Sequence, residues 1–154
     1  MSRCVMRIFE ISECYAASPV RAFALFRRPL ERIRLAPPEL HLSLEEAPAE
    51  VQLGSRLTVR GRRLGVTQRM TTEITALEEG SLIVEEQRQG PFRSWRHTQR
   101  FDESPDGVRI SDLIEYEPPG GVLGRLATAE ATVRELERAF AYRREQLTAT
   151  FRRP

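Results

Sequence analysis

The sequence predicts an α+β fold in which a curved, seven-stranded antiparallel sheet wraps around one long C-terminal helix. Three observations lead to this prediction. One strand-like segment near the N-terminus is followed by two short helical segments, and a long stretch with period-two hydrophobicity comes next. The C-terminal segment then changes to helical periodicity. Because a sheet with one apolar face needs a cover, we expect this last segment to lie across the sheet.

The N-terminal part of the chain is expected to form one strand and two helices. β-Branched and aromatic residues are frequent over residues 5–15, which predicts the strand. Ser18 is a suitable N-cap for the helical pattern that follows it. Pro29 interrupts that pattern, so the sequence predicts two short helices, over residues 19–28 and 29–35.

The central and C-terminal parts complete the sheet and supply its cover. Glycine and proline residues divide an alternating pattern into six further strands. These are expected over residues 39–46, 55–64, 66–78, 81–89, 92–103 and 107–117. An apolar stripe from Leu126 to Phe151 predicts the long helix, with Arg143 and Arg144 near its C-terminal end, where cations complement the helix dipole. Residues 1–154 are therefore expected to form one domain, with no room for a separate cofactor domain.

Composition excludes several classes of function. All 24 basic residues are Arg and the chain contains no Lys and no Asn, which excludes a Lys Schiff base, a Walker-type lysine and an Asn-containing catalytic set. The 24 basic residues are balanced by 22 acidic ones, so we expect no nucleic-acid partner. The longest apolar run, Ala22–Phe26, is too short for integral membrane association. No secretory signal is recognisable, and the cytoplasm is the expected location.

The two cysteines predict neither a disulfide nor a metal site. Cys4 and Cys14 are ten residues apart around one expected strand, too far for a disulfide if the strand is extended. Neither has a second Cys or a His at ligand spacing, so we expect two reduced, packed thiols and no metal. No cofactor is expected.

Residues 85–124 carry a distinctive pattern, which reads Gln87, Gly90-Pro91-Phe92, Trp95, His97, Phe101, Gly107, Asp112, Tyr116, Pro119-Gly120 and Leu123-Gly124. With the order of elements, this pattern resembles the START/SRPBCC superfamily, which includes birch-pollen-allergen-like proteins and polyketide cyclases. The nearest resemblance is to a bacterial subgroup of small ligand-binding SRPBCC proteins. In that subgroup a His often stands in place of Gln99, and a Thr in place of Val108. The resemblance covers nearly the whole chain and implies the helix-grip fold.

Strand parity predicts which side chains of the last two strands face inward. The expected inward sets are Trp95, His97, Gln99 and Phe101 on one strand, and Val108, Ile110, Asp112, Ile114 and Tyr116 on the next. A carboxylate among apolar side chains is costly unless it is paired, so Asp112 needs a partner. Counting back from the turn at residues 105–107 places His97 directly opposite Asp112. Gln87 is expected nearby, and these three side chains predict a small polar cluster.

Two functions compete for this cluster. In the first, a cavity between sheet and helix binds a small hydrophobic molecule, such as a lipid, isoprenoid, quinone or polyketide, and the cluster orients its polar end. In the second, His97 and Asp112 are the acid–base pair of a cyclase, aromatase or dehydratase. No nucleophile, metal set or second acid accompanies the pair, which favours the binding module. The residues expected to contact the ligand are Met70, Gln87, Trp95, His97, Gln99, Asp112, Tyr116 and Phe140.

Two further alternatives stay open at this stage. Glu85 shares the parity of Gln87 and is either an inward acid or, like its neighbour Glu86, a surface residue. A protein-interaction role would need an exposed apolar patch, for which the sequence offers no clear candidate. The sequence predicts no oligomeric state.

Overall fold

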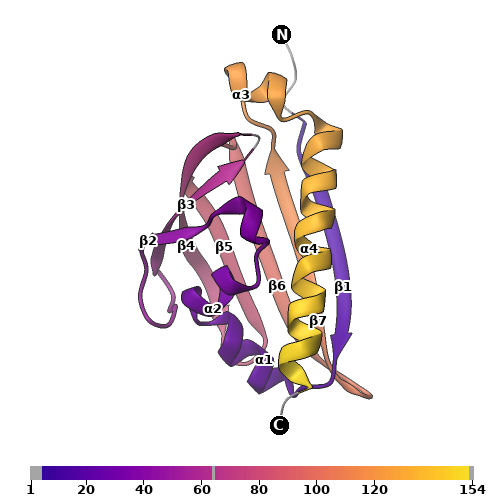
Figure 1. Ribbon diagram of the computed structural model, residues 1–154. Coiled ribbons are helices and arrows are strands. Elements are labelled where there is room, and N and C mark those ends of the chain that lie inside the picture. The colour runs from indigo at the N-terminus through magenta and orange to yellow at the C-terminus, as the bar shows by residue number, and fades with distance from the viewer. Residues whose placement is uncertain (1–4, 64, 153–154) are drawn as a thin grey trace.

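The computed structural model describes residues 5–63 and 65–152 and has the predicted helix-grip architecture (Figure 1). One antiparallel sheet has the strand order β1-β7-β6-β5-β4-β3-β2. Its strands are β1 (Arg7–Tyr15), β2 (Ser43–Glu46), β3 (Arg56–Arg63), β4 (Val66–Glu78), β5 (Leu82–Gln89), β6 (Ser94–Ser104) and β7 (Gly107–Glu117). The helices are α1 (Pro19–Phe26), α2 (Pro29–Arg34), the 3-10 helix η1 (Pro38–Leu40), α3 (Gly121–Leu126) and α4 (Ala129–Phe151).

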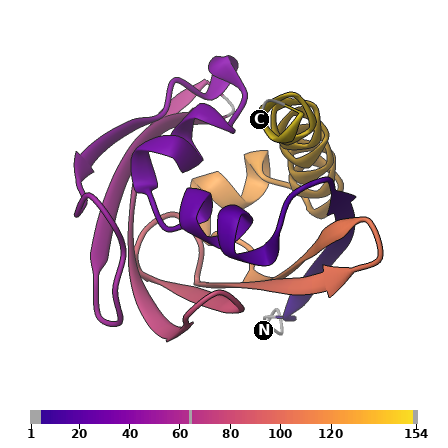
Figure 2. The same ribbon diagram turned by 90° about the horizontal axis from the view of Figure 1, so that it is seen from below.

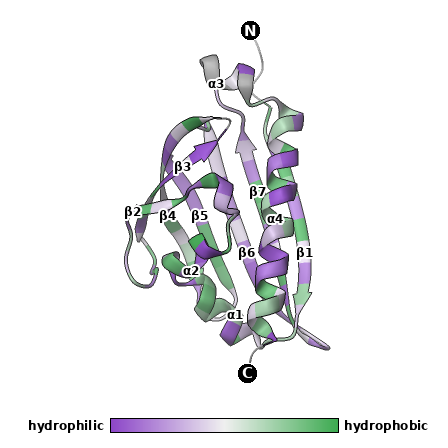
Figure 3. Cartoon of the chain, in the orientation of Figure 1, coloured by the Kyte–Doolittle hydropathy of each residue, from purple (hydrophilic) through white to green (hydrophobic). Residues whose placement is uncertain are grey.

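The sheet curves around its helices, as the view from below shows (Figure 2). Helices α1 and α2 lie within the curve, and α4 runs beside them along β1 and β7 (Figures 1 and 2). Hydrophobic and hydrophilic residues alternate along α4, which is the pattern of a helix with one buried face (Figure 3). This arrangement leaves the concave face of the sheet opposite α2 and α4.

Helices α1 and α2 begin where the sequence predicts them to begin, whereas α4 begins at Ala129, three residues after the predicted start at Leu126. The Ser18 hydroxyl accepts a hydrogen bond from the backbone N–H of Arg21, at 3.1 Å, and Pro29 opens α2. Thr128 caps α4 in the same way, because its hydroxyl accepts from the backbone N–H of Ala131 at 3.1 Å. These local signals fix where each helix enters the space above the sheet.

Two elements differ from the prediction. The strand expected over residues 39–46 begins only at Ser43, because residues 38–40 form the 3-10 helix η1. Proline at positions 37 and 38 fixes φ and removes two backbone donors, which favours a tight turn over a sheet ladder. The other difference is α3, a short helix that precedes α4 and was not predicted. Residue parity along β6 and β7 is as predicted.

The register between β6 and β7 differs from the prediction by two residues. Gln99, not His97, lies directly opposite Asp112, and His97 lies opposite Ile114. The reason is the turn: Ser104 pairs with Gly107, so only residues 105 and 106 connect the two strands. Because of this short turn, each residue of β6 pairs with the β7 residue two positions after the predicted one, and every side chain stays on its predicted face.

Two other expectations concern the cysteines and membrane association. Cys14 is exposed on β1, so the prediction of a packed thiol is wrong for this residue, and Cys4 lies outside the described residues. Within residues 5–63 and 65–152, none of the helices combines the length and the apolar character needed to cross a membrane.

Candidate functional site

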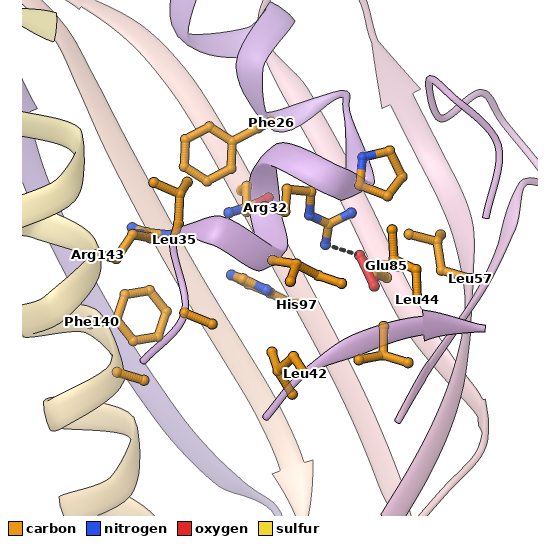
Figure 4. A pocket seen from close by; sticks show the side chains of 16 residues that line it. Phe26, Arg32, Leu35, Leu42, Leu44, Leu57, Glu85, His97, Phe140 and Arg143 are labelled. Carbon is orange, nitrogen blue, oxygen red and sulfur yellow. Dashed lines mark hydrogen bonds and ion pairs between the residues drawn. The ribbon is translucent and has the colours of Figure 1, made fainter. Parts of the chain in front are cut away.

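A pocket of about 240 Å³ lies between the concave face of the sheet and helices α2 and α4 (Figure 4). We call it the sheet–helix pocket. Most of its wall is apolar, with contributions from Phe26, Leu35, Leu42, Leu44, Leu57 and Phe140. The polar residues that line it are Arg32, Glu85, His97, Gln99 and Arg143. A mostly apolar wall with a few placed polar groups is the usual composition of a small-molecule site.

Charged and polar residues form one row across the concave face of the sheet, at the pocket. Glu85 on β5, His97 on β6 and Asp112 on β7 all point to the concave face. Arg32 from α2 pairs with the Glu85 end of this row, and Arg143 from α4 pairs with the Asp112 end. We call these five residues the polar row.

The polar row divides the core into two apolar clusters. Phe101 and Ile110 belong to the cluster under α1, whereas Ile114 and Tyr116 belong to the cluster toward the other end of the sheet. Asp112 lies between Ile110 and Ile114 on β7. Charged groups therefore occupy the middle of the protein, where each of them needs a partner.

Asp112 is the most densely bonded residue of the row, with 1% of its surface exposed. Arg143 binds both carboxylate oxygens: Nη1 donates to Oδ1 at 3.0 Å, and Nη2 donates to Oδ2. Gln99 Nε2 donates to Oδ1 at 3.0 Å, and Nε2 of His97 lies 2.8 Å from the same oxygen. A bidentate contact of this kind is the strongest form of an arginine–carboxylate ion pair.

Asp112 is ionised in this setting. Burial alone would raise the pKa of its carboxyl group. The nearby Arg143 charge and the hydrogen bonds from His97 and Arg143 outweigh that effect and hold the pKa well below its ordinary value. Arg143 also lies over the ring of Phe140, with its guanidinium carbon 4.4 Å from the ring centroid. The aromatic contact fixes the guanidinium at the edge of the pocket.

The other end of the row is a second, partly buried ion pair. Arg32 Nη2 donates to Glu85 Oε1, and the Thr72 hydroxyl donates to Glu85 Oε2 at 2.7 Å. Burial would raise the pKa of Glu85, but the Arg32 charge and these hydrogen bonds lower it overall. Glu85 lies directly opposite His97 on the neighbouring strand. Of the two alternatives for Glu85, the structure shows the inward acid.

The structure brings together some of the predicted site residues and separates others. His97, Gln99 and Phe140 line the sheet–helix pocket. Asp112, also predicted as a ligand contact, does not line it but binds the side chains of His97 and Gln99. The expected place of Gln87 beside His97 is wrong. Its Nε2 donates to the backbone carbonyl of Phe92 at 2.7 Å, so this side chain fixes the turn between β5 and β6.

Three more predicted ligand contacts lie away from the pocket. The rings of Phe92, Trp95 and Tyr116 pack against one another, with centroids 4.7–5.9 Å apart in the three pairs. Met70 lies next to Gly90, where a Cβ atom would come within 3.1 Å of its Cγ. The inward parity of Trp95 and Tyr116 is as predicted, but their side chains fill the second apolar cluster and do not border the pocket.

Sequence reasoning did not identify Arg32 or Arg143 as members of the site. Arg143 was assigned to the helix end, although it shares a face of α4 with Phe140 and Leu147. An arginine that falls at helical spacing between apolar residues is expected to lie on the buried face of the helix, and this pattern could have identified Arg143. Arg32 has no comparable signal, because α2 is too short to show a periodic stripe.

A second cleft of about 850 Å³, which we call the open cleft, adjoins the pocket. It lies between α4 and the segment from η1 to β3, and its rim carries Arg62, Arg134 and Arg138. Ala139 of α4 borders both the cleft and the sheet–helix pocket. Among the described residues, no group of three or more His, Cys, Asp or Glu is arranged to hold a metal ion.

Comparison with known proteins identifies the fold. No family model and no curated protein matches the sequence. A protein from Chromobacterium violaceum is 15% identical with a TM-score of 0.72, covering 92% of this chain and 95% of its own. A protein from Thermus thermophilus is 19% identical with a TM-score of 0.70, covering 95% of this chain and 99% of its own.

A plant protein has the same architecture. Ginseng major latex-like protein 151 from Panax ginseng is 13% identical with a TM-score of 0.66, covering 92% of this chain and 97% of its own. These matches extend over almost the whole length of both chains. They confirm the helix-grip fold that the sequence predicts.

Proposed function

We propose that the protein binds a small hydrophobic molecule in the sheet–helix pocket. The observation that carries this proposal is the composition of the pocket wall, which is apolar except for Gln99 and four members of the polar row, Arg32, Glu85, His97 and Arg143. An apolar wall favours transfer of an apolar molecule from water, by roughly 25 cal/mol for each Å² of apolar surface buried. The row then supplies a fixed polar end that orients the bound molecule.

The volume of the pocket favours a compact ligand. A dry cavity of about 150 Å³ is enough to bind benzene in a protein core. The sheet–helix pocket, at about 240 Å³, has space for one substituted ring or a short branched chain. A longer ligand would extend past Ala139 into the open cleft.

Native mass spectrometry of protein purified from its own host tests the proposal. We expect an adduct of constant mass that is released when the protein is unfolded. The same protein, stripped of the adduct, should bind the small apolar probe toluene saturably, with NMR shifts at methyl groups of Leu44 and Leu57. The absence of both an adduct and saturable toluene binding would contradict the proposal.

Catalysis by His97 and Asp112 is the second candidate. The observation in its favour is the 2.8 Å contact between Asp112 Oδ1 and Nε2 of an imidazole that lines the pocket. A carboxylate that orients a histidine is a common arrangement for general acid–base catalysis. If a turnover reaction is found, His97→Ala should lower kcat by about 100-fold or more. Unchanged turnover in this variant and in Asp112→Asn would exclude the pair as catalytic.

A further inference from the structure

We propose that the ligand of the sheet–helix pocket carries a hydroxyl group, and that this group donates a hydrogen bond to Nδ1 of His97. The inference rests on the proposed binding function and adds the chemical class of the ligand: a compact, uncharged alcohol or phenol. Three properties of the polar row support it, namely the fixed tautomer of His97, the free nitrogen and the charge balance.

The bonds of Asp112 fix the tautomer of His97. An ionised carboxylate only accepts hydrogen bonds, so Nε2 of His97 must be the donor in its 2.8 Å contact with Asp112 Oδ1. Arg143 holds the same carboxylate through both of its oxygens. In the neutral imidazole, the hydrogen is therefore on Nε2, and Nδ1 carries a lone pair.

No described residue donates to Nδ1 of His97. Arg32 Nη2 and the Thr72 hydroxyl bind Glu85, and Gln99 Nε2 binds Asp112. Arg32 Nη1 and Arg143 Nε are buried without a hydrogen-bond partner, so neither of them donates to Nδ1. The His97 side chain is 16% exposed and forms part of the pocket floor between Glu85 and Arg143 (Figure 4). A ligand in the pocket therefore meets an acceptor whose hydrogen-bonding capacity is unused.

The charge balance of the row favours an uncharged donor. Two arginines and two carboxylates cancel, so the neutral form of His97 leaves the row without net charge. A ligand carboxylate would find both arginines already paired with carboxylates and would lie near two like charges, Glu85 and Asp112. An ammonium ion would lie between two arginines. A hydroxyl group satisfies Nδ1 without bringing a charge into an apolar pocket.

The test compares phenol with toluene, which have nearly the same shape and differ by a hydroxyl in place of a methyl group. Affinities are measured by calorimetry near neutral pH for the wild type and for His97→Gln. A glutamine amide can reach Asp112 as Nε2 does, but it places no acceptor at the position of Nδ1. We expect the variant to bind phenol about tenfold more weakly and toluene within about twofold of the wild type.

A spectroscopic measurement on the wild type tests the hydrogen bond without a substitution that could change stability. The chain has two histidines, and the other one, His41, is exposed outside the sheet–helix pocket. With 15N-labelled histidine, phenol should shift the Nδ1 resonance of His97 in the wild type, toluene should leave it in place, and His41 serves as the internal reference.

The possible outcomes separate the two proposals. Equal weakening of phenol and toluene in His97→Gln, or an Nδ1 resonance that phenol does not move, would overturn the hydroxyl assignment while binding in the pocket stands. Failure of both probes to bind the wild type would overturn the binding function and the hydroxyl assignment with it.

Discussion

Replacement of Asp112 by asparagine is expected to lower the free energy of unfolding by about 3–5 kcal/mol. Asparagine keeps the shape of the side chain but leaves the guanidinium of Arg143 buried without a counterion. Arg143 has only 7% of its surface exposed, and water cannot replace the lost carboxylate. Breaking one side of a buried, doubly bonded pair is far more costly than losing a surface ion pair. Urea unfolding at neutral pH measures the difference.

Matched variants separate the charge effect from the substitution itself. Asp102 is exposed on β6, so Asp102→Asn should change stability by no more than about 0.5 kcal/mol. The double variant with Arg143→Met should recover much of the loss, because it removes the unpaired charge and replaces it with an apolar side chain. A loss below about 1 kcal/mol in Asp112→Asn would show that the pair contributes little.

The pH dependence of this difference follows from the lowered pKa of Asp112. The folded protein holds the carboxylate ionised at pH values where the unfolded chain, with an ordinary pKa of about 3.9, takes up a proton. The stabilisation is therefore complete above about pH 5 and decreases as the pH falls through and below the unfolded value. The stability difference between wild type and Asp112→Asn should decrease by up to about 1.4 kcal/mol per pH unit there.

The fold was predictable because its signals are local. The Ser18 cap, the Pro29 interruption and the two-residue periodicity of the strands each act within a few residues. The 3-10 helix η1 shows the limit of this reasoning, since alternating leucines predicted a strand where two prolines impose a turn. The alternating leucines have the hydrophobic pattern of a strand, but the two prolines lack the backbone N–H donors that strand pairing requires.

The candidate site was predictable only in part because it depends on contacts between distant segments. Parity correctly placed His97 and Asp112 on one face, but the turn after Ser104 decided their register. Arg143 reaches Asp112 across 31 residues of sequence, and Arg32 reaches Glu85 across 53. No local pattern encodes which cation meets which carboxylate. The sequence therefore indicated that Asp112 needs a partner without identifying Arg143 as that partner.

Ala139→Trp is expected to abolish ligand binding in the sheet–helix pocket while the fold is retained. Ala139 lies on α4 at the boundary between the pocket and the open cleft, where an indole would occupy much of the 240 Å³. We expect the affinity for toluene to fall at least about tenfold, which corresponds to about 1.4 kcal/mol of binding free energy. Calorimetric titration measures this change.

Ala149→Trp is the matched control, because Ala149 is exposed on the same helix and lines neither the sheet–helix pocket nor the open cleft. It should bind toluene as the wild type does. Trp95 is the only native tryptophan, so the added indole is visible by fluorescence. Emission at shorter wavelength in Ala139→Trp than in Ala149→Trp would show that its indole is buried. Undiminished toluene affinity with the indole buried would mean that the probe binds elsewhere, and the sheet–helix pocket would not be the binding site.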